Sequence, residues 1–310
     1  MAKENAPPLE ELYTPERRAI IEELIQVKHR RGWTDHSLAR RLGASATTLN
    51  RLLHCTYRAS SVPDWVEAMA KLLVRERRRA DETTAVEYAQ TQVADQVHDT
   101  VRLAQIEQTI ALILGASGCG KTTALRRYAA DNPECVYVVA GIDATPRAFL
   151  AQIAGQLGLA TEGSAYSARL AITEALTDTD RVLIIDECDY LTEAVLQALR
   201  MVQENAGIGL VLVGTQAYLA KLRGKSSATI AQVLQRISYV VNIVEAPQAD
   251  LRLIADAYGC DREAGRVLLQ RSGGSARRCV QAIRASRRFN GATLSAAGIA
   301  EAFNHLMPLE

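Results

Sequence analysis

The sequence feature that most restricts the fold is a glycine-rich segment of eight residues, Gly115 to Thr122, which reads GASGCGKT. It follows a short apolar run at 110–114 and precedes an amphipathic segment at 123–130. This strand–turn–helix context fits the phosphate-binding pattern G-x-x-x-x-G-K-[ST]. Glycines let successive backbone N–H groups surround a phosphate, and the helix N-terminus adds its positive dipole end. The segment therefore predicts a loop that binds the phosphates of a nucleotide.

Two side chains of this loop carry the predicted chemistry. The Lys121 ammonium can reach the β and γ phosphates of ATP, and the Thr122 hydroxyl can ligate Mg²⁺. We therefore predict an ATP hydrolase that uses ATP and Mg²⁺. The variable position Cys119 is assigned no chemistry of its own. The predicted nucleotide-binding residues of the loop are Gly115, Ala116, Ser117, Gly118, Cys119, Gly120, Lys121, Thr122 and Thr123.

Two further apolar runs end in polar residues that suit hydrolysis. The run at 182–185 is followed by Asp186 and Glu187, about 65 residues after the glycine-rich loop. We predict that Asp186 helps Thr122 to hold Mg²⁺, and that Glu187 polarises the attacking water. The run at 210–213 is followed by Gly214 and Thr215. The Thr215 side chain is predicted to contact either the γ phosphate or the attacking water.

Helical and strand patterns alternate through the middle of the chain and predict an α/β fold. Strands alternating with helices favour a parallel sheet of five strands with helices on both faces. The predicted domains are a helical domain at 1–82, a polar linker at 83–100, an α/β ATPase core at 101–247 and a C-terminal helical domain at 248–310. The apolar runs that predict strands are Ile110–Leu114, Val136–Ala140, Val182–Ile185, Leu210–Val213 and Tyr239–Val244.

Composition excludes several classes of protein. Apolar residues make up 48% and charged residues 23%, the balance of a globular chain rather than a disordered one. The longest apolar runs are too short for a membrane span, and the first residues lack the apolar core of a signal peptide. We therefore expect a cytoplasmic protein with no membrane partner. The six cysteines form no C-x-x-C pair, which favours reduced, buried thiols over a zinc site.

Basic charge is concentrated in two segments although the net charge is only +1. Between positions 28 and 79 there are 12 basic and 4 acidic residues, and between 266 and 288 there are seven arginines and no acid. Such clusters indicate either a polyanionic partner or a solvated surface.

The segment Trp33–Leu53 resembles a helix-turn-helix. Ala39 stands where the two helices must pack closely, and Gly43 stands at the turn. We predict that the second helix contacts DNA through Thr47, Thr48, Asn50 and Arg51, which suit phosphates or base edges. The alternative is a helical capping domain that contacts no DNA.

From about Gln90 to its end, the chain resembles the AAA+ ATPases, and among them the Mu B-type family of target-DNA activators that serve DDE transposases. The general resemblance lies in the glycine-rich loop and the two acids at 186–187. Four features carry the narrower one. A helical module precedes the ATPase, and Thr91-Gln92-Val93 stands where the family has its nucleotide-base pocket. The block from Val182 to Thr215 has the family's spacing, and Gly274-Ser275-Ala276-Arg277 has its lid pattern.

The resemblance implies roles for several residues. Thr215 is similar to the residue called sensor 1, and Arg277 to the sensor-2 arginine, which leans from the lid onto the γ phosphate. Arg236 stands where the arginine finger of a neighbouring subunit often lies, and Arg223 is the competing candidate. An arginine finger implies that the active form is a homo-oligomer. DNA contacts in related assemblies imply a role for Arg147 and for Lys225 on a second polar loop.

The resulting expectation is an ATP-dependent AAA+ ATPase that binds double-stranded DNA with weak sequence specificity. The resemblance implies that it selects target DNA for a DDE transposase, stimulates that transposase, and forms a helical filament on DNA. Its place would be the host cell cytoplasm if a phage encodes it. Two alternatives remain open: a helicase-loader or initiator-like ATPase, and a helix-turn-helix transcription regulator with an ATPase switch.

Overall fold

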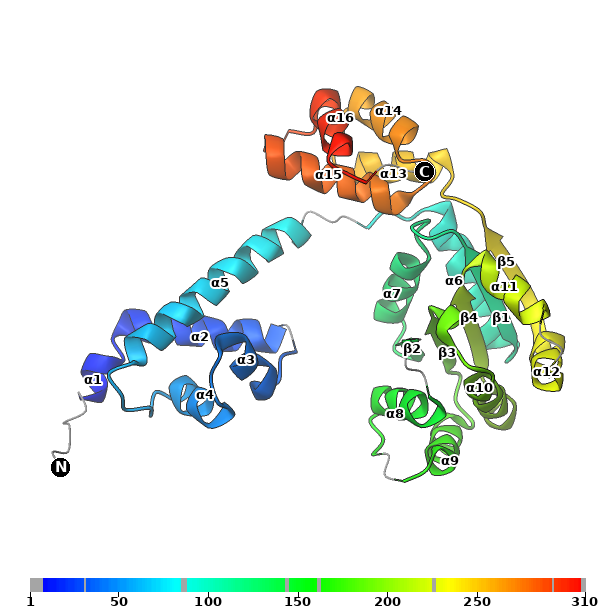
Figure 1. Cartoon of the computed structure of the whole chain (residues 1–310), viewed down its shortest axis with the longest axis horizontal. Helices are drawn as coiled ribbons and strands as arrows, with labels where there is room; N and C mark the ends of the chain where they lie inside the picture. The colour runs from blue at the N-terminus through cyan, green and yellow to red at the C-terminus, as the bar shows by residue number, and fades with distance from the viewer. Residues whose placement is uncertain are drawn as a thin grey trace. The chain divides into compact units, whose positions relative to one another are not determined.

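The structure, a computed structural model, describes residues 8–30, 32–84, 88–142, 145–160, 163–224, 227–291 and 293–307 (Figure 1). The chain forms two compact units, Met1–Val86 and Glu87–Glu310. Within the described ranges, no helix has both the length and the apolar character needed to cross a bilayer.

The N-terminal unit is helical, as predicted. Its helices surround a core that contains Leu24, Leu38, Leu49 and Met69, all fully buried. Two of its helices begin with a side-chain cap, because Thr34 accepts a hydrogen bond from the Ser37 N–H and Ser45 accepts one from the Thr48 N–H. The helices are α1 (Leu9–Leu12), α2 (Pro15–Arg30), α3 (Asp35–Leu42), α4 (Ala46–Leu53) and α5 (Val62–Thr84).

The second unit contains the predicted parallel sheet. Its five strands are arranged in the order β2-β3-β4-β1-β5, and each neighbouring pair is parallel. Every residue of β1, β3 and β4 is buried, which is why these strands read as continuous apolar runs. The strands are β1 (Ile110–Gly115), β2 (Cys135–Val139), β3 (Val182–Asp186), β4 (Gly209–Gly214) and β5 (Ile237–Ile243).

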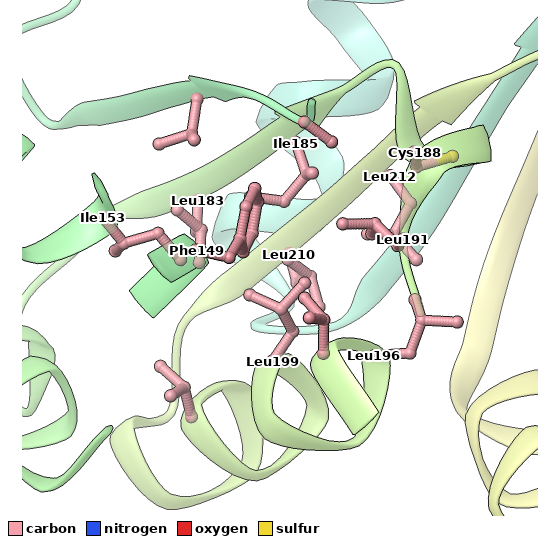
Figure 2. Packing of buried hydrophobic residues seen from close by; sticks show 14 of the residues in the cluster. Phe149, Ile153, Leu183, Ile185, Cys188, Leu191, Leu196, Leu199, Leu210 and Leu212 are labelled. Atoms are coloured by element: carbon pink, nitrogen blue, oxygen red, sulfur yellow. The ribbon is translucent and has the colours of Figure 1, made fainter. Parts of the chain in front are cut away.

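Helices cover both faces of this sheet and enclose two separate cores. Because successive strand residues point to opposite faces, Leu183 and Ile185 belong to one core and Val182 and Ile184 to the other. Figure 2 shows the first core, where side chains of α8, β3, β4 and α10 meet. Helices α6 (Gln92–Ile106) and α7 (Lys121–Asp131) cover one face. The other face packs against α8 (Pro146–Gln156), α9 (Ala165–Leu176), α10 (Glu193–Ala206), α11 (Gln216–Arg223) and α12 (Ala228–Arg236).

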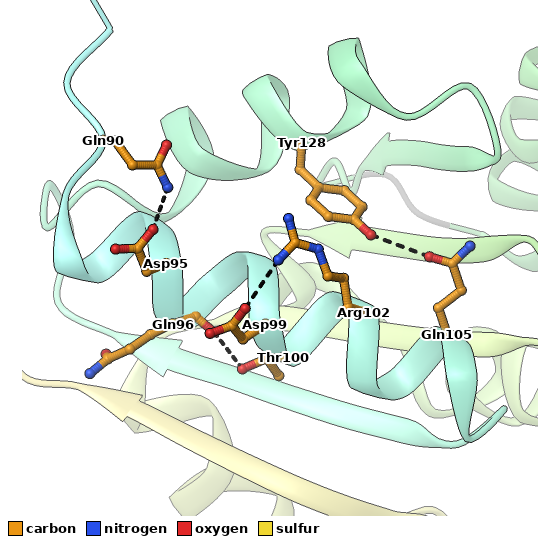
Figure 3. A network of polar contacts seen from close by, with 8 residues as sticks. All are labelled: Gln90, Asp95, Gln96, Asp99, Thr100, Arg102, Gln105 and Tyr128. Atoms are coloured by element: carbon orange, nitrogen blue, oxygen red, sulfur yellow. Dashed lines mark hydrogen bonds and ion pairs between the residues drawn. The ribbon is translucent and has the colours of Figure 1, made fainter.

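The predicted linker at 83–100 is wrong over 92–100, because these residues form the first turns of α6. Val93, Val97, Val101 and Ala104 recur at helical spacing and are buried against the sheet. Polar residues stand between these apolar residues in the sequence, so the helical pattern was not recognised. Figure 3 shows several of these polar residues hydrogen-bonded to one another within the helix, for example Arg102 to Asp99 at 3.2 Å.

Four helices form a C-terminal helical domain, the lid, around a core of their own, as predicted. Three arginines of this region, Arg271, Arg278 and Arg287, donate hydrogen bonds to backbone carbonyls of the lid. Arg271 donates to Ala300 O at 2.7 Å and Arg287 donates to Tyr258 O at 2.7 Å, both near helix C-termini. The helices are α13 (Gln248–Ala257), α14 (Arg262–Arg271), α15 (Ala276–Asn290) and α16 (Ala296–Asn304).

All six cysteines are free thiols, as the sequence predicts. Burial raises the pKa of the Cys135 and Cys279 thiols to about 12 in each case. Since such thiols stay protonated at neutral pH, they behave as small apolar groups. Within the described residues, no group of three or more histidine, cysteine or acidic side chains is placed to bind a metal ion.

A buried carboxylate joins the lid to the α/β core. Asp250 on α13 is 1% exposed and accepts hydrogen bonds from the backbone N–H groups of Gln92 at 2.8 Å and Val93 at 3.0 Å. Thr91 accepts the next free N–H, that of Ala94, at 3.1 Å. The first turn of α6 thus has its N–H groups satisfied from two elements far apart in the sequence.

Replacing Asp250 with alanine should destabilise the second unit by about 1–3 kcal/mol, because two N–H groups lose their acceptor. Thermal melting of the full chain measures this loss, and Asp256→Ala on an exposed position of α13 is the matched control. The control should change stability by less than about 0.5 kcal/mol. Hydrogen exchange at the Gln92 and Val93 amides should accelerate in Asp250→Ala alone; unchanged exchange would contradict the capping role.

Candidate nucleotide-binding and hydrolysis site

Three of the predicted motifs converge at the carboxyl ends of three neighbouring strands. Strand β1 pairs with β4, with Leu114 opposite Gly214, and β4 pairs with β3, with Leu212 opposite Ile185. The segments that leave these strands are the glycine-rich loop, the segment beginning at Thr215 and the segment beginning at Glu187. The parallel register therefore places the three predicted motifs side by side, the usual location of ligand sites in open α/β sheets.

The glycine-rich loop connects β1 to α7 and places its lysine inside the turn. The Lys121 ammonium donates hydrogen bonds to Gly115 O at 2.7 Å and Ala116 O at 2.9 Å. The loop and the first turn of α7 combine backbone N–H groups, a helix N-terminus and one ammonium in a single concave turn. This arrangement suits the phosphates of a nucleotide.

Asp186 is the most highly connected acid of the site. It is 2% exposed, and its Oδ2 accepts hydrogen bonds from the hydroxyls of Thr122 and Tyr137, each at 2.8 Å. Its Oδ1 accepts the Glu187 N–H at 2.9 Å. The predicted pairing of Thr122 with Asp186 is thus present in the structure. A hydroxyl and a carboxylate are hard oxygen donors of the kind Mg²⁺ takes alongside substrate phosphates, so these residues fit that ion.

Tyr137 of β2 was not predicted from the sequence as a site residue. Burial and the neighbouring Asp186 carboxylate raise the pKa of its phenol above the ordinary value. The phenol therefore keeps its proton at neutral pH and remains a donor to Asp186. Its sequence neighbours in the Val136–Ala140 run are apolar and did not indicate the hydrogen bond to Asp186, which lies 49 positions away in the sequence.

Glu187 is exposed at the carboxyl edge and has a left-handed backbone, with φ of 55°. This conformation is costly for a residue that carries a Cβ, and it is concentrated at functional sites. It turns the chain from β3 into a short 3₁₀ helix, η1 (Cys188–Tyr190). The turn leaves the Glu187 carboxylate at the surface beside the loop and directs the following residues toward β4.

Thr215 lies directly after β4, where the sequence predicts it, and is held by a residue that was not predicted. Asp189 Oδ2 accepts the Thr215 N–H at 2.9 Å, and Asp189 Oδ1 accepts the Thr215 hydroxyl. Asp189 could have been suspected from its place two residues after Glu187.

Arg277 extends from the lid to the glycine-rich loop. Its backbone N–H donates to Gly118 O at 3.0 Å, and its guanidinium donates to Ser117 Oγ at 3.1 Å. Gly118 has φ of 86°, and a Cβ there would lie 2.7 Å from Ser275 Oγ, so the close approach of the lid requires glycine. The arginine predicted from the lid pattern is therefore located at the candidate phosphate site.

Arg236 lies at the amino-terminal end of the strands, whereas the glycine-rich loop lies at their carboxyl end. Arg236 ends α12 directly before Ile237, which pairs with Ile110 at the start of β1. The length of β1, about 20 Å at roughly 3.3 Å per residue, separates this end of the strands from the loop. The Arg236 guanidinium is paired with Glu204 at 3.0 Å. It cannot reach the loop of its own chain. The competing Arg223 is exposed at the end of α11.

The predicted DNA-binding residues that the structure describes lie on exposed or partly exposed positions. Thr47, Asn50 and Arg51 are exposed on α4, whereas the Thr48 hydroxyl is bonded to Ser45 at 2.8 Å. Arg147 is exposed in the first turn of α8. Lys225 lies outside the described residues.

Known proteins resemble this chain at the level of sequence and fold. The family model described as an AAA domain matches residues 105–222. The Mu-like prophage FluMu DNA transposition protein B of Haemophilus influenzae is 31% identical over 243 residues, which cover 76% of this chain and 84% of that protein. The ATP-dependent target DNA activator B of Escherichia phage Mu is 32% identical over 195 residues, which cover 59% of this chain and 60% of that protein.

The likeness to one solved structure concerns the fold. The Aeropyrum pernix ORC2 protein, solved in ADPNP–ADP complexes, has a TM-score of 0.56 and 18% sequence identity, over 70% of this chain and 68% of that one. Together with the AAA domain match and the five-stranded parallel sheet, it shows an AAA+ P-loop fold.

Lys121→Ala should lower the affinity for ATP about 10- to 100-fold, because charge-assisted hydrogen bonds contribute roughly 1.5–3 kcal/mol each. The fold should survive, since this side chain bonds only to the loop itself. Binding of a fluorescent ATP analogue measures the loss, with circular dichroism as the check of folding. The matched control is Lys71→Ala, an exposed lysine of the N-terminal unit. Unchanged ATP binding by a folded Lys121→Ala protein would refute the nucleotide assignment.

Proposed function

The chain belongs to the Mu B-like family of AAA+ ATPases, and from that membership we propose that it is an ATP-dependent activator of target DNA for transposition. The observation that carries this proposal is the junction of Thr122, Asp186 and Arg277 at one end of the sheet. These residues bring the glycine-rich loop, the acids at the end of β3 and the lid together at the place proposed for a nucleoside triphosphate. The name of the phage Mu relative supplies the link to target DNA.

The proposed reaction is the hydrolysis of ATP to ADP and phosphate. Lys121 and Arg277 neutralise the phosphate charge, and Thr122 with Asp186 would hold Mg²⁺, which would supply further neutralisation of that charge. Glu187 is exposed beside the loop and acts as the base that polarises the attacking water. Arg277 also couples the position of the lid to the bound nucleotide, because its backbone N–H donates a hydrogen bond to Gly118 O in the glycine-rich loop.

We propose that the chain forms a homo-oligomer, a helical filament on DNA, and that ATP lies between neighbouring protomers of this filament. Arg236 supports this, because it is too far from the loop of its own chain and is exposed enough to reach another. Its present partner Glu204 also pairs with Arg200, so that carboxylate retains a counter-ion when Arg236 leaves. A neighbour's γ phosphate is the partner proposed for Arg236.

The proposed DNA partner is a duplex bound mainly through its phosphates. The N-terminal unit carries the basic segment between positions 28 and 79, with 12 basic and 4 acidic residues. Helices α3 and α4 are joined at Gly43 in a left-handed conformation, which supports a helix-turn-helix with Asn50 and Arg51 toward DNA. Arg147 is a second candidate contact. Phosphate contacts make such binding salt-sensitive and weakly specific for sequence.

The proposed partner of the assembly is a DDE transposase, which receives the captured DNA and is stimulated by the DNA-bound ATPase. The compartment proposed for this activity is the cytoplasm, that of the host cell if a phage encodes the chain, where target DNA and ATP occur together. Hydrolysis releases the assembly from the DNA.

Glu187→Gln should bind ATP normally and hydrolyse it about 100- to 10,000-fold more slowly, because the amide cannot accept the proton of water. Its complexes with duplex DNA should persist longer than those of the wild type. The measurement is dissociation from labelled duplex after a chase with unlabelled DNA, in ATP. Faster dissociation would contradict release by hydrolysis.

Three further assays of the wild-type chain distinguish the alternatives: competition between single-stranded and duplex DNA, footprinting, and a transposition assay. A preference for single strands would favour a helicase loader or initiator, and protection of one defined operator would favour a transcription regulator. Stimulation of a DDE transposase from the same element by the wild type, with ATP and duplex present, is the result expected for a target-DNA activator.

Arg236→Ala should lower ATPase activity and ATP-dependent assembly while leaving ATP binding to a single protomer intact. Its exposed ion pair contributes little to stability, so the fold should be unaffected. Mixing it with Lys121→Ala gives the sharper measurement. Each variant damages a different side of the same interface, so mixed assemblies contain some intact sites and should exceed either variant in activity.

The matched control is Arg223→Ala mixed with Lys121→Ala. Recovery in that mixture alone would assign the arginine finger to Arg223. Co-assembly of Arg236→Ala with Lys121→Ala without recovery would contradict a role for Arg236 in the neighbour's site.

A further inference from the structure

The Asp189 carboxylate binds both protons that Thr215 can offer. One oxygen accepts the Thr215 N–H at 2.9 Å, and the other accepts its hydroxyl. A threonine hydroxyl has one proton and two lone pairs. With its proton directed to Asp189, the Thr215 oxygen can only accept further hydrogen bonds.

Because the Thr215 hydroxyl can only accept, its two predicted roles, contact with the γ phosphate and contact with the attacking water, can be distinguished. The oxygens of a γ phosphate are acceptors, so a hydroxyl that has already donated its proton cannot bond to them. A water molecule has protons to donate and suits the free lone pairs of Thr215. The geometry therefore favours contact with the attacking water over contact with the γ phosphate.

The backbone around Asp189 is shaped for this contact. The left-handed Glu187 turns the chain into η1, where the Tyr190 N–H donates to Glu187 O at 3.2 Å and the Leu191 N–H donates to Cys188 O at 2.9 Å. At the end of β4, a Cβ on Gly214 would lie 2.6 Å from Asp189 Oδ2 and 2.7 Å from Cys188 Sγ. Only glycine therefore lets η1 approach β4 closely enough for Asp189 to reach Thr215.

We propose that Asp189 is a positioning residue that fixes Thr215 as a hydrogen-bond acceptor for the attacking water. The proposal rests on the proposed ATPase function. The water donates one proton toward the Glu187 carboxylate and the other to Thr215 Oγ1, which leaves an oxygen lone pair free for the γ phosphorus. As the new P–O bond forms, the bond from that phosphorus to the β–γ bridging oxygen breaks. The water proton passes to Glu187, and ADP leaves with the electron pair.

The test is a double-mutant cycle with Asp189→Asn and Thr215→Val. Asparagine keeps the shape of Asp189 but has one acceptor atom instead of two, and valine keeps the shape of Thr215 without the hydroxyl. Each single variant should lower kcat about 100-fold, the order expected for a misplaced reactant, with KM changed less than about threefold. Because Asp189 acts through the hydroxyl, the double variant should be no slower than the slower single variant.

Further variants separate positioning from a merely structural role. Thr215→Ser keeps the hydroxyl and should retain at least about ten times the kcat of Thr215→Val. Gly214→Ala should lower kcat like Asp189→Asn, because its methyl group displaces the carboxylate. The matched control is Asp256→Asn, an exposed acid on α13 that should leave kcat unchanged.

The melting temperatures of the wild type, Asp189→Asn, Thr215→Val and the double variant test the hydrogen bond between Asp189 and Thr215 independently of ATPase activity. The loss of melting temperature in the double variant should equal the larger single loss. Multiplicative losses of kcat together with additive losses of melting temperature would overturn the proposal. A wild-type chain that hydrolysed no ATP would refute the proposed function and the catalytic part of this inference, while the melting cycle would still decide whether Asp189 holds Thr215.

Discussion

The parallel pairing of β1, β4 and β3 is the constraint on which the rest of the second unit depends. Because these strands are buried on both faces, their register is determined by two cores at once. A shift of one residue would exchange Leu183 and Ile184 between the cores and move Asp186 away from Thr122. The same register places Gly115, Thr215 and Glu187 at one edge. The chemistry of the site is therefore a consequence of packing that lies well away from it.

The polar groups at this edge form two connected sets. Asp186 joins the glycine-rich loop to β2 and β3 through Thr122 and Tyr137. Asp189 joins the segment after β3 to the end of β4. In each set a carboxylate accepts several hydrogen bonds, which fixes its orientation. These acids differ from Glu187, whose side chain is exposed.

The motifs were predictable because their geometry is local in sequence. The glycine-rich loop, the acids after β3 and the lid arginine each follow from a short pattern, and the strands follow from apolar runs. The contacts that complete the site could not be predicted. Asp189 meets Thr215 across 26 positions, and Asp250 meets Gln92 across 158. Such pairs depend on how whole elements pack, which no pattern within one segment records. The α6 helix was missed for a related reason, since its narrow apolar stripe is diluted by polar residues.

The buried Asp250 has a consequence for how the lid can move. Separating α13 from α6 would break two hydrogen bonds to a charged carboxylate, each of which contributes about 1.5–3 kcal/mol. The lid and the first turn of α6 should therefore move as one rigid body. Arg277 adds a second attachment, from the lid to the glycine-rich loop. A bound nucleotide would then be enclosed by parts that do not separate easily, so its exchange would require a concerted opening whose rate these few polar contacts set.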